Sequence, residues 1–182
     1  QNVALGPDGD RMPEGTAFLG LFPRDENDDG VTEVPEAREM QCLDEEGERQ
    51  YYVVWRQYSA DGTAADVQSC YHNVEDGWNL KLPEEWSKEK LVAERTVGAD
   101  ESAVSFYRVG ADGSRKKVLT IYRLTGSMRE ELAGIGDRFT LTRQVEAVYA
   151  AEIGDTWNMQ LTEQSLRDRF SLIMAEWTMG DN

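Results

Sequence analysis

Oxygen-bearing side chains alternate along one short acidic segment of the chain. Asp25, Asn27 and Asp29 are each separated by one residue, Gly30 follows directly, and Glu33 closes the run. A hard cation such as calcium requires about six to eight oxygen ligands that converge on one point. Alternate residues of a curled loop can supply these oxygens, and a glycine can adopt positive φ where the chain turns sharply. The spacing therefore predicts a structural calcium loop.

Two other interpretations of this segment stay open. In the first, the loop is an acidic turn whose Asx side chains accept hydrogen bonds from the main chain without an ion. In the second, the loop is an EF-hand, because Glu36 occupies the twelfth position. Pro35 and the strand-like flanking residues argue against the exiting helix that an EF-hand requires.

The remaining metal-binding and nucleophilic residues do not form a catalytic pattern. His72 is the only histidine, and it follows Cys70 by two positions. A zinc site needs three or four ligands, and a serine nucleophile normally needs a base at a recognisable position. Cys42 and Cys70 either form a disulfide or remain two buried thiols. We expect no catalytic residue and no enzyme.

The composition limits the kinds of partner that the protein can bind. Its 182 residues carry a formal charge of -16 at pH 7, of which -10 falls within residues 1–50. Nucleic acid and anionic membrane surfaces would repel such a chain. No segment is long and apolar enough to span a bilayer. We therefore expect no nucleic acid partner and no membrane span.

The first half of the chain reads as an extended arm followed by short strands. Residues 1–15 are rich in glycine and proline and lack apolar periodicity. The segments 17–22 and 51–58 are apolar, aromatic or β-branched, so both are predicted strands. Asp61 and Gly62 form a turn signal, after which residues 65–71 return as a partner strand.

In the second half of the chain, apolar and polar residues alternate after residue 77 as far as Pro83, which predicts another strand. Ser127 begins a predicted short helix through residue 132, with Glu130 completing a capping box and Gly134 closing it. Trp86 lies in a predicted loop or turn between strands. The further predicted strands are 91–96, 103–109, 117–124, 139–143 and 146–153.

The C-terminal segment predicts a long amphipathic helix from Thr162 to Trp177. Thr162 is a plausible N-cap, and Leu166, Phe170, Ile173 and Trp177 repeat at spacings of four, three and four. Such a stripe is typical of a helix that packs across a sheet.

A larger part of the chain resembles a known type of domain. The segment 80–86, Leu-Lys-Leu-Pro-Glu-Glu-Trp, precedes Ala103–Tyr107 and Val118–Tyr122. This arrangement resembles uncharacterised bacterial surface-protein domains and, more remotely, PsbP, the extrinsic photosystem II protein. The resemblance implies an α+β fold with an antiparallel sheet flanked by helices over residues 76–182.

The acidic segment resembles the calcium loop of FG-GAP or VCBS propeller repeats, here written Asp-Glu-Asn-Asp-Asp-Gly-Val-Thr-Glu-Val-Pro. The resemblance implies ligation by the side chains of Asp25, Asn27, Asp29 and Glu33 and by the Val31 carbonyl. This chain has one copy only, with glutamate where aspartate is usual at the last ligand. We therefore expect a small, blade-like all-β unit over residues 16–75 that packs on the second unit or ends a longer parent chain.

These observations together predict an extracytoplasmic, non-catalytic binding or scaffold module in the cell envelope. Its partner would be a protein or glycan at the cell surface, and a lipid anchor on a longer form of the protein is compatible. Because the chain begins at Gln1 without a leader-like segment, we expect a removed leader or a longer parent. Two alternatives stay open: a carboxylate-based hydrolase or its accessory domain, and a glycan or peptide receptor that uses exposed Trp86 or Trp157.

Overall fold

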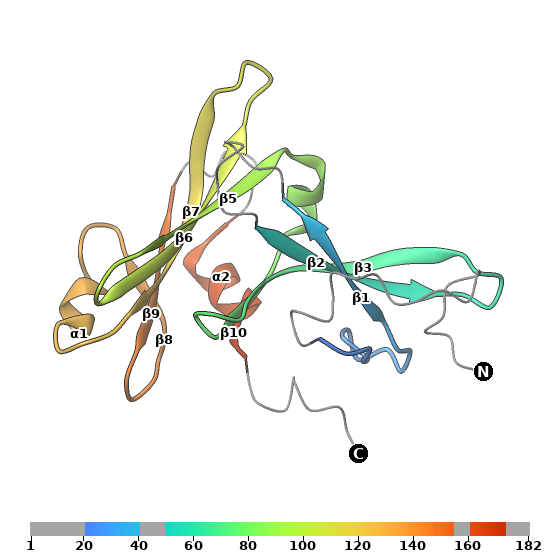
Figure 1. The fold of residues 1–182 in the computed structure, drawn as a ribbon, viewed down its shortest axis with the longest axis horizontal. Coiled ribbons are helices and arrows are strands. Elements are labelled where there is room, and N and C mark those ends of the chain that lie inside the picture. Colours follow the sequence, from blue (N-terminus) through green and yellow to red (C-terminus); the bar gives the residue numbers. More distant parts are fainter. Residues whose placement is uncertain (1–20, 41–49, 155–160, 174–182) are drawn as a thin grey trace. The chain divides into compact units, whose positions relative to one another are not determined.

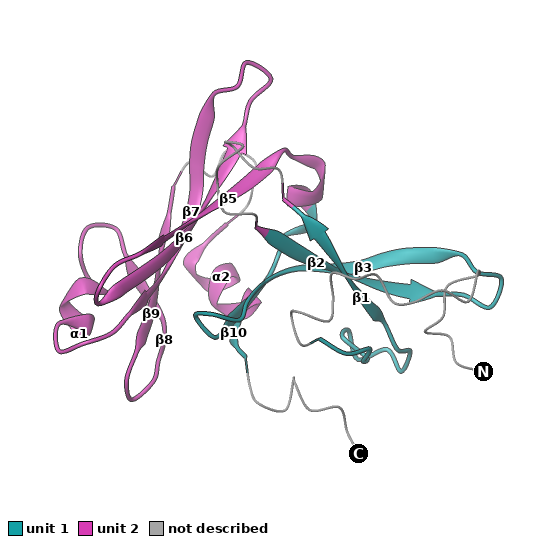
Figure 2. Cartoon of the chain, viewed as in Figure 1, with its two compact units in different colours: residues 1–39, 51–84, 171–182 teal, residues 40–50, 85–170 magenta. Residues whose placement is uncertain are grey.

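The chain is folded mainly into antiparallel β-sheet. The structure, a computed structural model, describes residues 21–40, 50–154 and 161–173. Within them, two five-stranded sheets account for most of the regular structure (Figure 1). Residues 1–39, 51–84 and 171–182 form one compact unit, and residues 40–50 and 85–170 form a second (Figure 2). This division differs from the predicted ranges 16–75 and 76–182, because the strand that follows residue 75 belongs to the first unit.

The first unit contains a sheet in the order β1-β2-β3-β4-β10. Its strands are β1 (Val34–Glu39), β2 (Tyr51–Tyr58), β3 (Ala64–Asn73), β4 (Trp78–Lys81) and β10 (Phe170–Leu172). The predicted strand at 51–58 is confirmed, and the turn after it is closed by Gly62 at φ 84°. β1, β2, β3 and β4 pair as antiparallel neighbours, with a bulge between Trp55 and Arg56.

One row of residues across this sheet carries the core of the first unit. Ala37 pairs with Val53, and Val53 pairs with Cys70. Leu21, from the segment before the acidic loop, packs with Val53, Trp55 and Cys70 in a buried cluster. The residues directly before the loop therefore cover this face of the sheet.

The second unit contains a sheet in the order β5-β6-β7-β9-β8. Its strands are β5 (Leu91–Val97), β6 (Glu101–Val109), β7 (Arg115–Leu124), β8 (Phe139–Arg143) and β9 (Val148–Ile153). One cluster on this sheet joins Tyr122, Leu124 and Val148 to Ala133, which follows the short helix α1 (Arg129–Leu132). Tyr122 also donates to Glu152 at 3.1 Å and lies under the guanidinium of Arg138.

The predicted α+β class with flanking helices is wrong. Strands account for 51% of the structure and helices for 12%, so the protein is β-rich. The long C-terminal helix is the main cause of the error. The helix α2 (Glu163–Arg169) begins at the predicted N-cap Thr162, whose side chain accepts from the Ser165 N–H. It ends at Phe170, which is extended and starts β10, so pairing at the sheet edge overrides the helical stripe.

Two smaller predictions also fail. Met128, not Ser127, is the N-cap residue of α1, and no side chain caps that helix. Ile173 lies beyond β10 in non-helical structure, where its N–H donates to the Gly77 carbonyl at 2.9 Å. Trp177, most of the predicted strand 17–22 and the predicted arm 1–15 lie outside the described residues.

Candidate functional site: the acidic loop of the first unit

The acidic loop is closed at its base by main-chain hydrogen bonds. The Arg24 N–H donates to the Glu33 carbonyl at 3.1 Å, and the Glu33 N–H donates to the Arg24 carbonyl at 2.8 Å. Glu33 then leads directly into β1. All five predicted calcium ligands therefore lie in one ring of backbone between residues 24 and 33.

Side chains at alternate positions fold back onto the main chain of the ring. Asp25 accepts from the N–H groups of Asp29 at 3.1 Å and Gly30 at 2.7 Å. Asn27 accepts from the Asp29 N–H at 3.1 Å, and Asp29 accepts from the Val31 N–H at 2.8 Å. Gly30 has φ 84°, as a sharp turn requires. The loop is thus curled, as the spacing predicts. The same hydrogen bonds are those expected of an acidic turn that holds no ion.

Glu33 differs from the other predicted ligands because it is fully buried, with 0% of its surface exposed. Its Oε2 accepts from the Glu26 N–H at 2.8 Å, and its Oε1 lies 3.4 Å from the Gln57 side-chain amide nitrogen. The same Gln57 nitrogen donates to Asp29 Oδ2 at 3.1 Å. Gln57, on β2, therefore draws the carboxylates of Asp29 and Glu33 toward one point.

No cationic side chain neutralises Glu33 within the described part of the chain. Both of its hydrogen-bond donors are neutral amides, and none of the ion pairs in these residues includes it. Burying an ionised carboxylate without a counter-charge costs several kcal/mol in general. A cation bound at the loop would offset that cost.

The carboxylates are nevertheless not assembled into a complete cluster. Over residues 21–40, 50–154 and 161–173, no group of three or more His, Cys, Asp or Glu side chains is arranged to hold a metal ion. Hydrogen bonds, first from Asn27 and then from Val31, lower the pKa of Asp29. Ligation by all five groups would therefore require a rearrangement of the loop.

The twelfth position does not take part in the loop. Glu36 lies in β1, where its carboxylate pairs with Arg56 at 3.1 Å and with Arg38 at 3.6 Å. A strand follows the loop in place of a helix. The geometry is therefore not that of an EF-hand.

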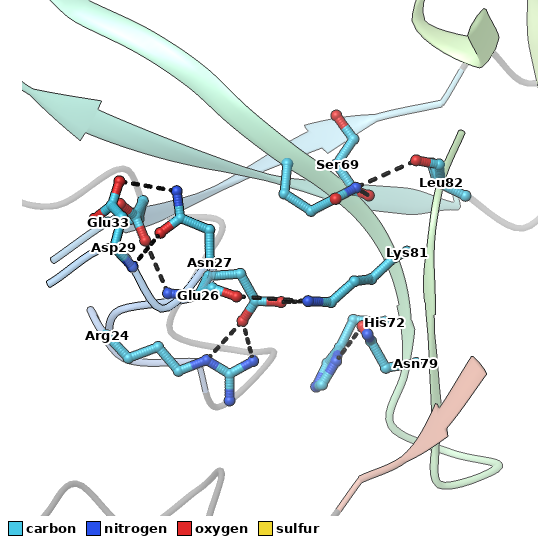
Figure 3. Close-up of polar contacts among 11 residues, drawn as sticks. Arg24, Glu26, Asn27, Asp29, Glu33, Ser69, His72, Asn79, Lys81 and Leu82 are labelled. Carbon is cyan, nitrogen blue, oxygen red and sulfur yellow. Dashed lines mark hydrogen bonds and ion pairs between the residues drawn. The ribbon is translucent and has the colours of Figure 1, made fainter. Parts of the chain in front are cut away.

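Glu26 ties the loop to the sheet beneath it. Its buried carboxylate binds the Arg24 guanidinium and lies 3.3 Å from Lys81 Nζ on β4 (Figure 3). The Arg24 guanidinium also stacks over the Trp55 ring, 4.9 Å from its centroid. These contacts hold residues 24–26 against the sheet.

A small polar group lies on the same face of the sheet. Cys70 pairs with Lys81 across β3 and β4, and His72 pairs with Asn79. Asn79 Oδ1 lies 3.2 Å from His72 Nδ1 (Figure 3), while Asn79 Nδ2 is buried without a hydrogen-bond partner in the described structure. Burial lowers the pKa of His72 and raises that of Cys70 to about 12. A buried neutral thiol is unreactive, and Cys70 is a free thiol; Cys42 lies outside the described residues.

The predicted exposure of Trp86 is wrong. The indole is 2% exposed and packs against Phe106, with ring centroids 5.5 Å apart. Its polar neighbours lie in a short 3₁₀ helix, Glu84–Lys88, whose buried residue is Trp86. Trp157 lies outside the described residues. Trp86 therefore offers no surface for a glycan or peptide.

Sequence reasoning did not identify Gln57, Glu26 or Asn79 as residues near the site. Gln57 reaches the loop only because of the register between β2 and its neighbours, which no local pattern reveals. Glu26 lies within the acidic run, next to Asn27, and this position was the one feature of the sequence that could have pointed to its place at the loop.

The described helices are all too short or too polar to cross a membrane. Comparison of the chain with protein-family models, with curated proteins and with solved structures found no match.

Proposed function

We propose that the protein is an extracytoplasmic, non-catalytic binding or scaffold module of the cell envelope whose Asp25–Glu33 loop holds a structural calcium ion. The observation that carries the calcium site is the fully buried Glu33 carboxylate, which closes a ring of oxygen donors and lacks a cationic partner among the described residues. Asp25, Asn27 and Asp29 would supply further side-chain oxygens, and Val31 would supply its carbonyl.

The proposed location sets the affinity that the site should have. Residues 27–32 are solvent-exposed, and the loop comes from one short segment, so we expect a dissociation constant of about 10⁻⁴ to 10⁻³ M, as in extracellular modules. Such a site is filled only where calcium is near millimolar. The ion would have a structural role, because it would fix a segment that carries several like charges.

The non-catalytic part of the proposal is supported by the state of two potentially reactive side chains within the described residues. Cys70 is buried and protonated, and His72 is buried beside Asn79. Neither is placed to act on a substrate at the surface. The identity of a protein or glycan partner stays a prediction, as does the alternative of a carboxylate-based hydrolase.

Thermal unfolding with calcium and with chelator tests the site. A ligand that binds only the folded state at 10 to 100 times its dissociation constant adds about 1.4–2.7 kcal/mol of stability, which is a shift of several degrees. Asp29→Asn should abolish the shift. Glu36→Gln, which removes the same charge from β1, should preserve it. Equal melting temperatures with calcium and chelator in the unmodified protein would refute the calcium site.

A further inference from the structure

One hairpin of the second unit is positively charged although the chain as a whole is acidic. β6 and β7 form this hairpin (Figure 1). Residues 105–120 hold four basic residues and one acidic residue, a net charge of +3, whereas the rest of the chain carries -19. Arg115 and Lys116, where β7 begins, are exposed to solvent. The charge of the hairpin is therefore opposite in sign to that of the molecule.

The strand register places an aromatic ring among basic side chains on one face of the hairpin. Tyr107 lies opposite Lys117 on β7. Two positions further along β6, Val109 lies opposite Arg115, and its N–H donates to the Lys90 carbonyl at 2.9 Å. Alternate residues of a strand share a face, so Lys90 and Arg115 are on the same face as Tyr107. From the strand spacing and the rise per residue, their Cα atoms lie about 8 Å from that of Tyr107.

Hydroxyl and carboxylate oxygens continue this face toward the middle of the sheet. Ser105 and Thr120 lie opposite each other, and their hydroxyl oxygens are 2.9 Å apart. Thr120 also lies opposite Glu152 on β9, whose carboxylate accepts from Lys117 Nζ at 2.9 Å. Tyr107 is partly exposed between this polar row and the basic side chains at the end of the hairpin.

We propose that this face of the β6–β7 hairpin binds an anionic glycan, a single chain of sugars that carry carboxylate groups. The apolar C–H face of a sugar ring would pack on the Tyr107 ring, and the carboxylate would be held by Lys90 and Arg115. The hydroxyl groups of the next sugar would hydrogen-bond to Ser105 and Glu152. This inference rests on the binding role proposed above and not on the calcium loop.

The distribution of charge favours a narrow polyanion over a broad one. A bilayer or a nucleic acid duplex spreads its charge over a wide area, so the -19 carried by the rest of the chain would oppose its approach. A single glycan chain can contact the hairpin alone, at distances within the Debye length of about 8–10 Å. The partly exposed Tyr107 ring and the row of hydroxyl groups favour a sugar over an acidic peptide, because a sugar ring offers both an apolar face and hydroxyl groups.

Isothermal titration with hexagalacturonate, a linear oligomer with one carboxylate per sugar, tests this site. The titration is made in chelator, because calcium crosslinks such oligomers. We expect binding that weakens as salt is added, since exposed charges are screened. The methyl-esterified oligomer keeps the sugar rings and loses the charges, so it should bind at least about tenfold more weakly.

Four variants make the test specific. Tyr107→Ala should weaken binding at least about tenfold, whereas Tyr107→Phe, which keeps the ring, should stay within about twofold of the unmodified protein. Arg115→Gln, at an exposed position where the fold is not at risk, should weaken binding about threefold or more. Arg123→Gln removes the same charge from the opposite face of β7 and should leave the affinity unchanged.

Four results would overturn the inference: no binding of hexagalacturonate at low salt, equal binding of its methyl ester, no effect of Tyr107→Ala and Arg115→Gln, or equally tight binding of a hexaglutamate peptide or of anionic phospholipid vesicles. Shortening of the oligomer by the protein, measured by anion-exchange chromatography, would support the site and overturn the non-catalytic function. A missing calcium-dependent melting shift together with intact binding would remove the calcium site and leave the glycan site standing.

Discussion

The main-chain N–H of Glu26 donates to the buried carboxylate of Glu33 at 2.8 Å, so the beginning and the end of the acidic loop meet inside the protein. The carboxyl group of Glu33 is therefore held where water does not reach it. Substitution of Glu33 tests whether this group serves an ion.

Glu33→Gln should remove the stabilisation by calcium. Both carboxylate oxygens of Glu33 accept hydrogen bonds, so the NH2 group of a glutamine would face one of the two N–H donors, and we expect the free energy of unfolding in chelator to fall by about 1–3 kcal/mol. In calcium, the variant should gain nothing from the ion and fall further below the unmodified protein. Urea unfolding of both proteins in both buffers measures this, and a calcium-dependent rise in the stability of the variant would contradict it.

Gly30→Ala should destabilise the loop through the backbone alone. Gly30 has φ 84°, and a Cβ built there meets no atom within 4 Å, so the cost is conformational and not steric crowding by neighbours. We expect a loss of about 1–2 kcal/mol. Gly134→Ala is the control, because its φ lies outside the left-handed region and its Cβ would lie 3.7 Å from the Glu131 carbonyl. Equal effects of the two substitutions would be inconsistent with this explanation.

His72 should make the protein less stable in mild acid. Burial lowers its pKa in the folded state below the ordinary value of 6.5. The unfolded chain therefore binds the proton first as the pH falls below about 6.5. Stability should decrease from that pH down to the folded-state pKa, by at most about 1.4 kcal/mol per pH unit for one proton. Urea midpoints between pH 7.5 and 5.5 in chelator measure the slope, and His72→Gln should reduce it; an unchanged slope would exclude His72 as its source.

Leu166→Ala should be costly although α2 has only seven residues. Leu166 is 0% exposed, so truncation leaves a cavity and should lower the free energy of unfolding by about 2–5 kcal/mol. Gln164→Ala on the exposed side of the same helix should cost less than about 0.5 kcal/mol. Similar losses for the two variants would show that Leu166 does not pack in a core.

Local features of this protein were predictable from the sequence, and features that depend on distant pairing were not. Thr162 marks the start of α2 because its hydroxyl bonds a backbone N–H three residues later. The end of that helix depends on β10, whose partner strand lies about 90 residues earlier, so the apolar stripe through Phe170 was misleading. β2 was predictable because its aromatic and β-branched residues favour a strand in many contexts.

The same contrast between local and long-range features holds for the candidate site. The alternation of Asp25, Asn27 and Asp29 predicts a curled loop, and the hydrogen bonds within it agree. The burial of Glu33 and the reach of Gln57 depend on how β1 and β2 pair, which single-residue patterns do not contain. Trp86 is a similar case, because its polar sequence neighbours conceal the packing on Phe106.

The position of β10 has a consequence for how the protein is made. The other four strands of its sheet end at residue 81, whereas β10 spans residues 170–172. During synthesis, about 90 further residues must be added before the free edge of β4 can acquire β10 as its neighbour. Nascent and truncated forms would expose that edge, which is a template for pairing with other chains. A fragment that stops at residue 84 should therefore aggregate more readily than the 182-residue chain.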